Sequence, residues 1–343
     1  MILKELSEAI GVSGDEGAVR AVVLDAIREH VDEIDVDALG NLIALKRGTG
    51  RQRMRVMLDA HMDEVGLMVI DHDSDGFLRV RTVGGIDPRL LPAANLRVGP
   101  DRLPGVIGIK PIHLLREEEG EKVTTIEDLV VDIGASSKDE AKKLAPLGSY
   151  AAFATPFREL GPTVTGKAFD DRAGCAVLVE MLRGDRFRFD LHAAFTVQEE
   201  VGLRGAQVAA YRIQPDCAFA LEGTIADDIP KEKESSPTTA LGRGPAITVM
   251  DRSFVANRQL VRLLTSTAEE LGIPYQFKQP GVGGTDAGAI HTTREGVPSA
   301  TVSVPCRYIH SPVALLDLDD FNHTVDLMRE SLSRLTRRTL KRD

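Results

Sequence analysis

The spacing of apolar residues changes near Leu67 and changes back near Thr163, and this double switch constrains the fold more than any other feature of the sequence. Outside the interval, helical periodicity over residues 16–29 and 172–182 alternates with apolar, strand-like runs such as residues 53–60. Helices that alternate with strands in this way indicate a mainly parallel sheet with helices on both of its faces.

Inside the interval the chain breaks into short β-type runs, LMVID, FLRVRTV, GVIGIK and GSYAAFA, which are separated by Gly, Pro and Asp. Such punctuation is typical of a small β-rich module, and residues 137–144 are the one segment with a helical pattern. We therefore expect an α/β fold with a mixed, mainly parallel sheet flanked by helices. Residues 1–68 and 163–343 should form the main domain, and residues 69–162 should form an inserted β-rich domain.

Charge and composition narrow the classes of partner. The chain carries 42 basic and 52 acidic residues, a net charge of -10, and neither sign forms long blocks. Nucleic acid and anionic membranes are therefore not expected partners. The N-terminus lacks the apolar run of a signal peptide, and no apolar run approaches the ~20 residues of a membrane span. The cysteines Cys175, Cys217 and Cys306 form no CxxC pair, so we expect no thiolate zinc site and a reducing, cytoplasmic location.

The segment LDAHMDEVG, residues 58–66, carries the first chemical signal. His61 and Asp63 stand two positions apart at the end of an apolar run that is typical of a buried strand. Side chains two positions apart on a strand point to the same side, so an imidazole and a carboxylate would share one face. A metal-binding histidine commonly donates its second ring N–H to such a carboxylate, so this pair suggests a metal site.

Four further clusters of acids or histidine follow at expected strand ends, which is where ligands bind in open α/β sheets. Together with the first pair, the clusters are His61/Asp63, Asp170/Asp171, Glu199/Glu200, Glu222 and His310. Two imidazoles and three carboxylates are nitrogen and oxygen donors that suit Zn²⁺, Co²⁺ or Mn²⁺. A site for two metal ions also needs a carboxylate that bridges them.

Adjacent acids would face opposite ways on a regular strand. If Glu199 and Glu200 serve one site, the chain must leave the strand before them, which Gly202 and Gly205 would permit. One Glu could then bind metal while its neighbour transfers protons. Taken one at a time, the clusters have simpler interpretations: a solvated Glu pair, an acidic N-cap for the helix after Asp171, and a structural histidine. The five clusters would be unrelated only if all of these simpler interpretations were correct at once.

Five motifs, LDAHMDEVG, GKAFDDRAG, VQEEVGLRGA, GGTDAG and RYIHSP, occur in the order and at the separations found in the tetrahedral (TET) aminopeptidases. The chain thus resembles a glutamyl aminopeptidase-like family of dinuclear metallo-aminopeptidases, and the resemblance extends over almost its whole length. It implies a zinc-peptidase-like α/β domain that binds two divalent metal ions per subunit, Zn²⁺ or Co²⁺. It also implies that the inserted domain mediates dimerisation and that the dimers assemble into a homo-oligomer, a dodecamer.

The resemblance assigns a role to each residue of the site. The implied metal ligands are His61 and Glu222 for one ion, Glu200 and His310 for the other, and Asp170 as the bridge. Glu199 resembles the general base, and Asp63 resembles the carboxylate that holds the first histidine. Position 222 is a departure, because many relatives have Asp there, but Glu offers the same kind of oxygen donor. The peptide bond between the two acids at positions 170 and 171 is expected to be cis, as at the matching pair of related peptidases, so that both side chains serve the site.

We therefore expect an aminopeptidase that releases N-terminal residues from peptide substrates with a metal-activated water and a Glu general base. Two alternatives remain: an amidohydrolase or deacylase that acts on non-peptide amides, and a non-catalytic assembly protein that keeps the metal site. Asp286 either lines the site or is structural, and Arg172 and Arg307 either contact substrate or balance the acids. Three histidines have no comparable partner in the sequence and are not expected to bind metal: His113, His192 and His291.

Overall fold

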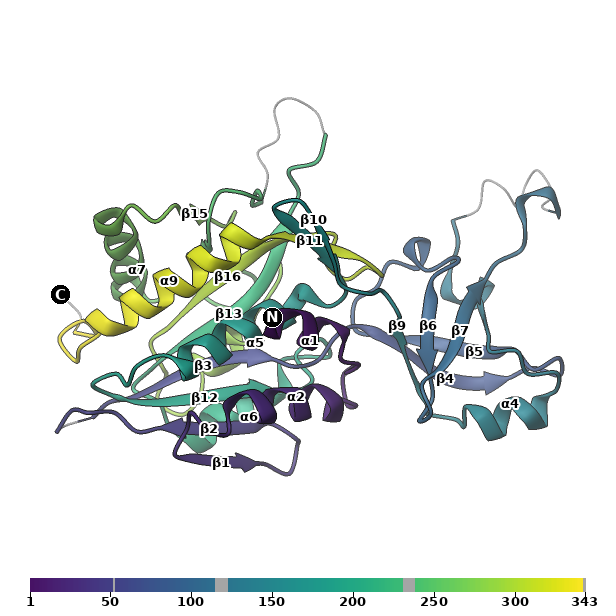
Figure 1. The fold of residues 1–343 in the computed structure, drawn as a ribbon, viewed down its shortest axis with the longest axis horizontal. Coiled ribbons are helices and arrows are strands. Elements are labelled where there is room, and N and C mark those ends of the chain that lie inside the picture. The colour runs from purple at the N-terminus through teal and green to yellow at the C-terminus, as the bar shows by residue number, and fades with distance from the viewer. Residues whose placement is uncertain (52, 115–122, 231–237, 342–343) are drawn as a thin grey trace.

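The larger part of the molecule is built on a mixed sheet (Figure 1). The computed structural model describes residues 1–343 except 52, 115–122, 231–237 and 342–343. Within the described residues this sheet has eleven strands. In spatial order its main path runs β1 (Glu33–Val36), β2 (Leu42–Lys46), β12 (Asp190–Thr196), β3 (Arg55–His61), β13 (Cys217–Ala226), β16 (Ser299–Arg307), β17 (Ala314–Asp317), β11 (Thr163–Gly166) and β10 (Arg158–Leu160). Off this path, β14 (Ala246–Thr248) pairs with β16 and with β15 (Gln276–Phe277).

The centre of this sheet is parallel and its two sides are antiparallel. Strands β12, β3, β13 and β16 run in the same direction. Strands β1 and β2 on one side, and β17, β11 and β10 on the other, are joined by antiparallel pairings. In β3, Val56 and Leu58 face one buried cluster and Met57 faces another, because successive side chains of a strand point to opposite faces. Burial on both faces is typical of the centre of an α/β sheet, so the predicted α/β class is confirmed.

Helices cover both faces of the sheet (Figure 1). In the described residues of this α/β unit they are α1 (Ile2–Glu8), α2 (Gly17–Ile27), α5 (Phe169–Arg183), α6 (Arg204–Ile213), α7 (Arg258–Leu271), α8 (Ala287–Ile290) and α9 (Leu318–Arg334). Helices α1, α2, α5 and α9 contribute to the largest buried cluster, whereas α6 and α8 contribute to a cluster on the opposite face. No helix in the described part of the chain is long and apolar enough to cross a membrane.

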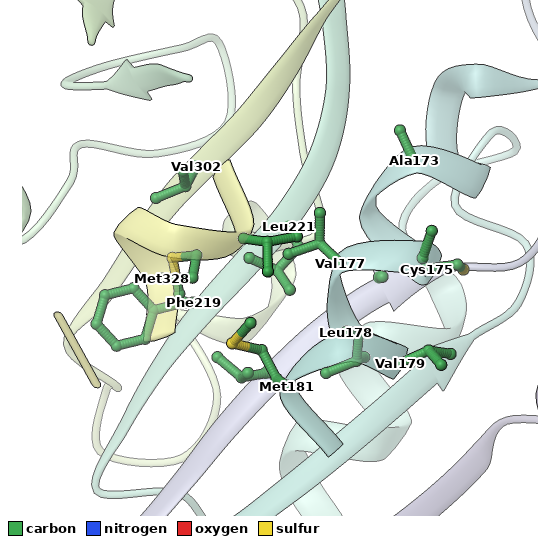
Figure 2. Close-up of a cluster of buried hydrophobic side chains, with 14 of the residues drawn as sticks. Ala173, Cys175, Val177, Leu178, Val179, Met181, Phe219, Leu221, Val302 and Met328 are labelled. Atoms are coloured by element: carbon green, nitrogen blue, oxygen red, sulfur yellow. The ribbon is translucent and has the colours of Figure 1, made fainter. Parts of the chain in front are cut away.

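Helix α5 is central to the main core, and Figure 2 shows how it packs. Its segment AGCAVLVEML is almost wholly apolar, so the helix is buried on nearly all sides. Val177 and Met181 lie toward Leu221 of β13 and Met328 of α9, and each of these side chains is at most 1% exposed (Figure 2). Regular helical geometry begins only after Asp171, as the sequence predicted. The acidic pair therefore stands where the helix begins, at the edge of the sheet.

The smaller part of the molecule is a closed β-barrel (Figure 1). Its strands, in order around the barrel, are β4 (Gly66–His72), β5 (Leu78–Val83), β8 (Val130–Asp132), β7 (Leu103–Gly108), β6 (Asn95–Val98) and β9 (Tyr150–Phe153). Alternate residues of β4, Leu67 and Val69, pack with Val98 and Phe153 in the barrel core. Helix α4 (Lys138–Leu144) contributes Ala141 to the same core. The β-rich character predicted for this interval is confirmed.

The barrel strands lie between residues 66 and 153, so they end well before the predicted limit of the insertion at residue 162. Strand β10 pairs with β11 in the main sheet, although the sequence placed it in the insertion. All three residues of β10 are exposed, so they carry no apolar pattern that could show which sheet they join. The division of the chain into two domains at residues 69 and 162 stays a prediction.

Candidate metal centre

The predicted site residues meet at one edge of the main sheet. His61 is the last residue of β3, and Glu199 and His310 follow shortly after β12 and β16. Glu222 lies inside β13, which continues beyond the strand end that the sequence predicted. Because these four strands are parallel, their carboxyl ends lie at the same edge. Asp170 joins the group from the start of α5.

Five side chains form two groups of potential metal donors. The first donor group is His61, Asp170 and Glu222, the second donor group is Asp170, Glu200 and His310, and the donor atoms of each group lie within 4.8 Å of one another. Asp170 Oδ1 lies 3.3 Å from His61 Nε2, and Asp170 Oδ2 lies 3.5 Å from His310 Nε2. His61 Nε2 is 3.6 Å from Glu222 Oε2, and His310 Nε2 is 3.2 Å from Glu200 Oε1. Each oxygen of Asp170 thus faces a different histidine, which is the arrangement of a bridging ligand.

Both histidines present Nε2 to the donor groups because their Nδ1 atoms lie against oxygen atoms elsewhere. His61 Nδ1 lies 3.2 Å from the carbonyl oxygen of Asp63 and 3.4 Å from its Oδ1. His310 Nδ1 lies 2.8 Å from the carbonyl oxygen of Gly85. When Nδ1 donates its proton to these oxygens, Nε2 keeps a free lone pair for a metal ion. All five side chains offer nitrogen or oxygen, so they fit a pair of divalent ions such as Zn²⁺ or Co²⁺.

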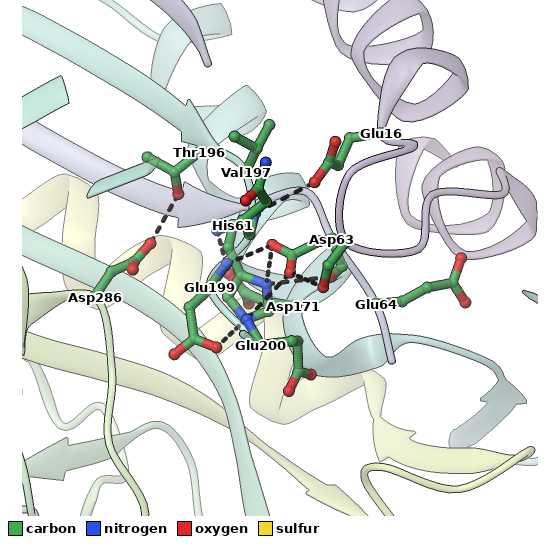
Figure 3. Close-up of polar contacts among 12 residues, drawn as sticks. Glu16, His61, Asp63, Glu64, Asp171, Thr196, Val197, Glu199, Glu200 and Asp286 are labelled. Atoms are coloured by element: carbon green, nitrogen blue, oxygen red, sulfur yellow. Dashed lines mark hydrogen bonds and ion pairs between the residues drawn. The ribbon is translucent and has the colours of Figure 1, made fainter. Parts of the chain in front are cut away.

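Asp63 organises the loops around the donor groups (Figure 3). It is fully buried, and its carboxylate accepts hydrogen bonds from the hydroxyl of Ser13 (2.6 Å) and the backbone N–H groups of Glu199 (2.9 Å) and Glu200 (3.1 Å). Burial raises the pKa of Asp63, but hydrogen bonds from His61 and the other donors outweigh it and hold this pKa below its ordinary value. An ionised Asp63 therefore ties the first histidine to the Glu pair.

The chain leaves strand β12 before the Glu pair, as the sequence predicted. The strand has ended by this point, and Gln198 has a left-handed φ of 58° and Gly202 one of 124°. Glu200 reaches the second donor group, whereas Glu199 belongs to neither group. Glu199 Oε2 lies 4.0 Å from His61 Nε2, so its carboxylate stands beside the donors.

The peptide bond between Asp170 and Asp171 is cis, which confirms the prediction. Asp170 points to the donor groups, while the side chain of Asp171 is buried against backbone N–H groups. Asp171 Oδ2 accepts the N–H of His61 at 3.1 Å, and its Oδ1 accepts the N–H of Gly174 at 2.8 Å. Asp171 thus braces the end of β3 against the start of α5.

Crowding of buried carboxylates shifts the pKa values in the site. Burial raises the pKa of Glu200 to about 7, and it raises the pKa values of Glu222 and Glu199 well above their usual range. Against the effect of burial, hydrogen bonds from the two histidines hold the pKa of Asp170 low. Burial also disfavours charge on His310, but Asp170 and Glu200 outweigh it and raise the pKa of His310 to about 10. A buried site with more carboxylates than imidazoles favours a cation, which stabilises the ionised acids.

The two arginines whose roles the sequence left open each pair with a carboxylate. Arg172 is fully buried, and its guanidinium donates to Glu64 Oε1 at 3.2 Å. Arg307 makes a two-point contact with Asp228, with N···O distances of 2.6 and 2.8 Å. Both arginines therefore balance acids.

Sequence reasoning missed a buried charged cluster behind the site. Lys167 Nζ contacts both carboxylate oxygens of Glu64 at 2.6 and 2.8 Å, and the N–H of Gly11 donates to Glu64 Oε1 at 3.0 Å. Lys167 and Glu64 are each 2% exposed, and burial lowers the pKa of Lys167 to about 8. The cluster ties the N-terminal segment to the loop after β3. The sequence signal for it was that Glu64 stands in the LDAHMDEVG motif and Lys167 in the GKAFDDRAG motif.

Asp286 is buried beside the site without joining either donor group. Its backbone N–H donates to Glu222 Oε1 at 3.3 Å, and its Oδ2 accepts the hydroxyl of Thr196 at 2.8 Å. Asp286 therefore supports one of the donor side chains. Neither donor group includes the three histidines that were not expected to bind metal, His113, His192 and His291.

Comparisons with known proteins identify the family to which the chain belongs. The family model described as M42 glutamyl aminopeptidase matches residues 40–327. A putative aminopeptidase of Acetivibrio thermocellus is 40% identical over 333 residues, which cover 96% of this chain and 97% of the relative.

Solved structures of an aminopeptidase and of a TET peptidase also match this chain. The aminopeptidase APDkam598 from the archaeon Desulfurococcus kamchatkensis matches with a TM-score of 0.94 at 38% identity, over 98% of this chain and 95% of that one. The TET1 peptidase of Pyrococcus horikoshii, which can assemble into a tetrahedron or a large octahedral shell, matches with a TM-score of 0.85 at 36% identity, over 97% of this chain and 99% of that one. The predicted resemblance is confirmed: this chain belongs to the M42 glutamyl aminopeptidase family.

Proposed function

We propose that this chain is a two-metal aminopeptidase that releases N-terminal residues from peptides. The observation that carries the proposal is the pair of donor groups that share Asp170, with Glu199 beside them and outside both. We assign one metal ion, Zn²⁺ or Co²⁺, to each donor group, with Asp170 as the bridge. When bound, such ions polarise the scissile carbonyl and lower the pKa of a water molecule.

Glu199 is the general base of the proposed reaction. It accepts a proton from the attacking water and returns it to the amine that leaves. Its backbone N–H is held by Asp63 at 2.9 Å. Burial raises the pKa of Glu199, which is the direction that suits a carboxyl group that exchanges protons during catalysis. Asp63 acts as a positioning residue, because it holds both Glu199 and His61.

Release of N-terminal residues is favoured by the family and by the names of its members. The relative from Acetivibrio thermocellus and the matching archaeal structure are both named as aminopeptidases. This chain aligns with each of them over nearly the full length of both partners. Peptides with a free N-terminus are therefore the proposed substrates.

The test compares free and acylated substrates. Protein loaded with Zn²⁺, Co²⁺ or Mn²⁺ would be assayed with aminoacyl p-nitroanilides and with their N-acetylated forms, and Glu199→Gln would serve as the control for the chemical step. We expect hydrolysis of the free forms only. Preferential hydrolysis of N-acyl compounds would indicate a deacylase, and metal binding without any hydrolysis would indicate a non-catalytic assembly protein.

We further propose that the protein is a homo-oligomer whose barrels form a dimer contact, with a dodecamer as the final state. The TET1 peptidase of Pyrococcus horikoshii supports this by its own assembly. The barrel also presents apolar side chains that are each at least 40% exposed: Ile70, Leu90, Val106, Ile109 and Leu147. Burying such side chains against a second copy would be favourable.

Light scattering tests the assembly directly. We expect a mass near twelve times the 37.2 kDa of one chain. Ile70 and Leu147 lie close together, because they flank the hydrogen bond from Gly148 N to Val69 O. The double variant Ile70→Asp with Leu147→Asp should therefore place two charges in the proposed dimer contact and lower this mass. A monomer mass for the wild-type protein at micromolar concentration would contradict the proposal.

A further inference from the structure

We propose that the barrel holds the loop that carries His310, and that this contact sets the affinity of the second donor group for its metal ion. The inference rests on the proposed two-metal function. It assigns a positioning role to Thr155 and to the loop at Gly84 and Gly85, none of which belongs to a donor group.

The loop that carries His310 joins β16 to β17 and has an unusual backbone. Tyr308 has a φ of 61° and His310 a φ of 57°, a left-handed region that residues other than glycine seldom adopt. Such a conformation persists where surrounding contacts fix it. Within the loop, Ser311 Oγ contacts the carbonyl oxygens of Tyr308 at 2.7 Å and Val313 at 2.6 Å. These bonds fix the shape of the loop, and the pairing of Arg307 with Leu315 and the packing of Ile309 on the main core hold its base.

The connection after β5 makes the first of two hydrogen-bonded contacts between the barrel side of the molecule and the tip of this loop. The carbonyl oxygen of Gly85 lies 2.8 Å from His310 Nδ1. Gly84, with a φ of 82°, packs so closely that an added Cβ would lie 2.8 Å from Val65 Cγ1 and 3.3 Å from Glu200 Cβ. This connection therefore touches both donors that belong to the second donor group alone. By contrast, the histidine of the first donor group is held by a carboxylate of the α/β unit.

Thr155 makes the second contact, from just beyond the last barrel strand, β9. Its hydroxyl donates to the carbonyl oxygen of Pro312 at 2.5 Å. Pro312 stands two positions after His310, so the barrel holds the loop at both its histidine side chain and its backbone. Loss of such outer partners of a metal ligand typically weakens metal affinity by about 10–100-fold.

Metal titration of Thr155 variants tests the inference without using activity. Metal-free wild-type protein, Thr155→Val and Thr155→Ser would be titrated with Zn²⁺ in competition with a chelating indicator. We expect two ions per chain in the wild type, a loss of about tenfold or more at one of the two sites in Thr155→Val, and recovery in Thr155→Ser. Thr163→Val is the matched control, because the Thr163 hydroxyl donates to the carbonyl of Leu160 at 2.8 Å in the β10–β11 hairpin.

Gly84→Ala provides a second, independent variant, since its methyl group would press on Val65 and, beside it, on Glu200. Gly134→Ala is its control, because Gly134 has a φ of 77° and nothing within 4 Å of an added Cβ. Thermal melts identify any variant that fails to fold. If one of Thr155→Val and Gly84→Ala does not fold, the metal affinities of the other variant test the inference. Wild-type affinity at both sites in Thr155→Val and Gly84→Ala, or an equal loss at both sites, would overturn the inference and leave the proposed function intact. A wild-type chain that binds fewer than two ions would remove the proposed function and the inference with it.

Discussion

Replacing Asp63 by Asn removes one charge from a fully buried carboxylate that serves four donors. Ser13 Oγ and the N–H of Glu200 donate to Oδ2, the N–H of Glu199 donates to Oδ1, and His61 Nδ1 lies 3.4 Å from Oδ1. An Asn side chain has one acceptor oxygen and one NH₂ group that can only donate. With the oxygen at the Oδ1 position, the NH₂ group faces the hydroxyl of Ser13, which can turn to accept, and the N–H of Glu200, which cannot.

The opposite orientation of the amide is worse, because its NH₂ group would face two donors, Glu199 N–H and His61 Nδ1–H. The better orientation still leaves one buried N–H unpaired, at a cost of about 1–3 kcal/mol. It also replaces charge-assisted hydrogen bonds by neutral ones of roughly half the strength. We therefore expect Asp63→Asn to lower the free energy of unfolding by about 2–4 kcal/mol. Looser placement of His61 and Glu200 should weaken metal binding by about 10–100-fold.

Chemical denaturation measures the free energy of unfolding, and titration against a chelating indicator measures metal affinity. Asp320→Asn is the matched control: Asp320 is 1% exposed and accepts the N–H groups of Gly242 at 2.7 Å and Gly244 at 2.6 Å, outside the site. The control should lose stability and keep its metal affinity. If Asp63→Asn is destabilised like the control but binds both ions as tightly as the wild type, the reasoning is refuted.

Three further predictions follow from the site and its surroundings. Glu199→Gln should keep both metal ions, because the donor set is untouched, and lower kcat by ~10² or more; near-normal turnover at full metal content would show that the base lies elsewhere. Lys167→Met leaves the buried carboxylate of Glu64 short of a partner, so the free energy of unfolding measured in urea should fall by about 3–5 kcal/mol. Arg186→Ala, which breaks the exposed ion pair with Asp32 at 2.6 Å, should lower the free energy of unfolding far less than Lys167→Met does, and equal effects of the two variants would argue against a special role for the buried cluster. Chelation by EDTA should abolish activity and lower the melting temperature, and Zn²⁺ or Co²⁺ should restore both; full activity without metal would rule out the mechanism.

The central elements of the fold could be predicted because each buries a continuous apolar run. Strand β3 and the regular part of α5 lie within a residue or two of the predicted ranges 53–60 and 172–182. Short and peripheral elements gave no comparable signal. Strand β10 is wholly exposed, α1 has only seven residues, and the antiparallel pairing of β17 with β16 depends on contacts that local periodicity does not encode.

The same limit applies to the site. The five donor side chains could be identified because acids and histidines that follow buried strands are unusual, and because their motifs match a family. Of the groups that hold these donors, Asp63 could be identified from its place in the first motif, but the others could not. The carbonyl of Gly85 has no side-chain signature, and the hydroxyls of Ser13 and Thr155 matter only through partners distant in the sequence. Glu64 and Lys167 are of types that usually lie on the surface, so their burial follows only from their mutual contact.

Anomalous diffraction from crystals grown with Zn²⁺ is the most direct test of the two-metal centre. We expect two anomalous peaks per chain, one in the first donor group and one in the second, with Asp170 in contact with both ions and Glu199 with neither. A single peak per chain, or an ion bound by Glu199 in place of Glu200, would contradict it.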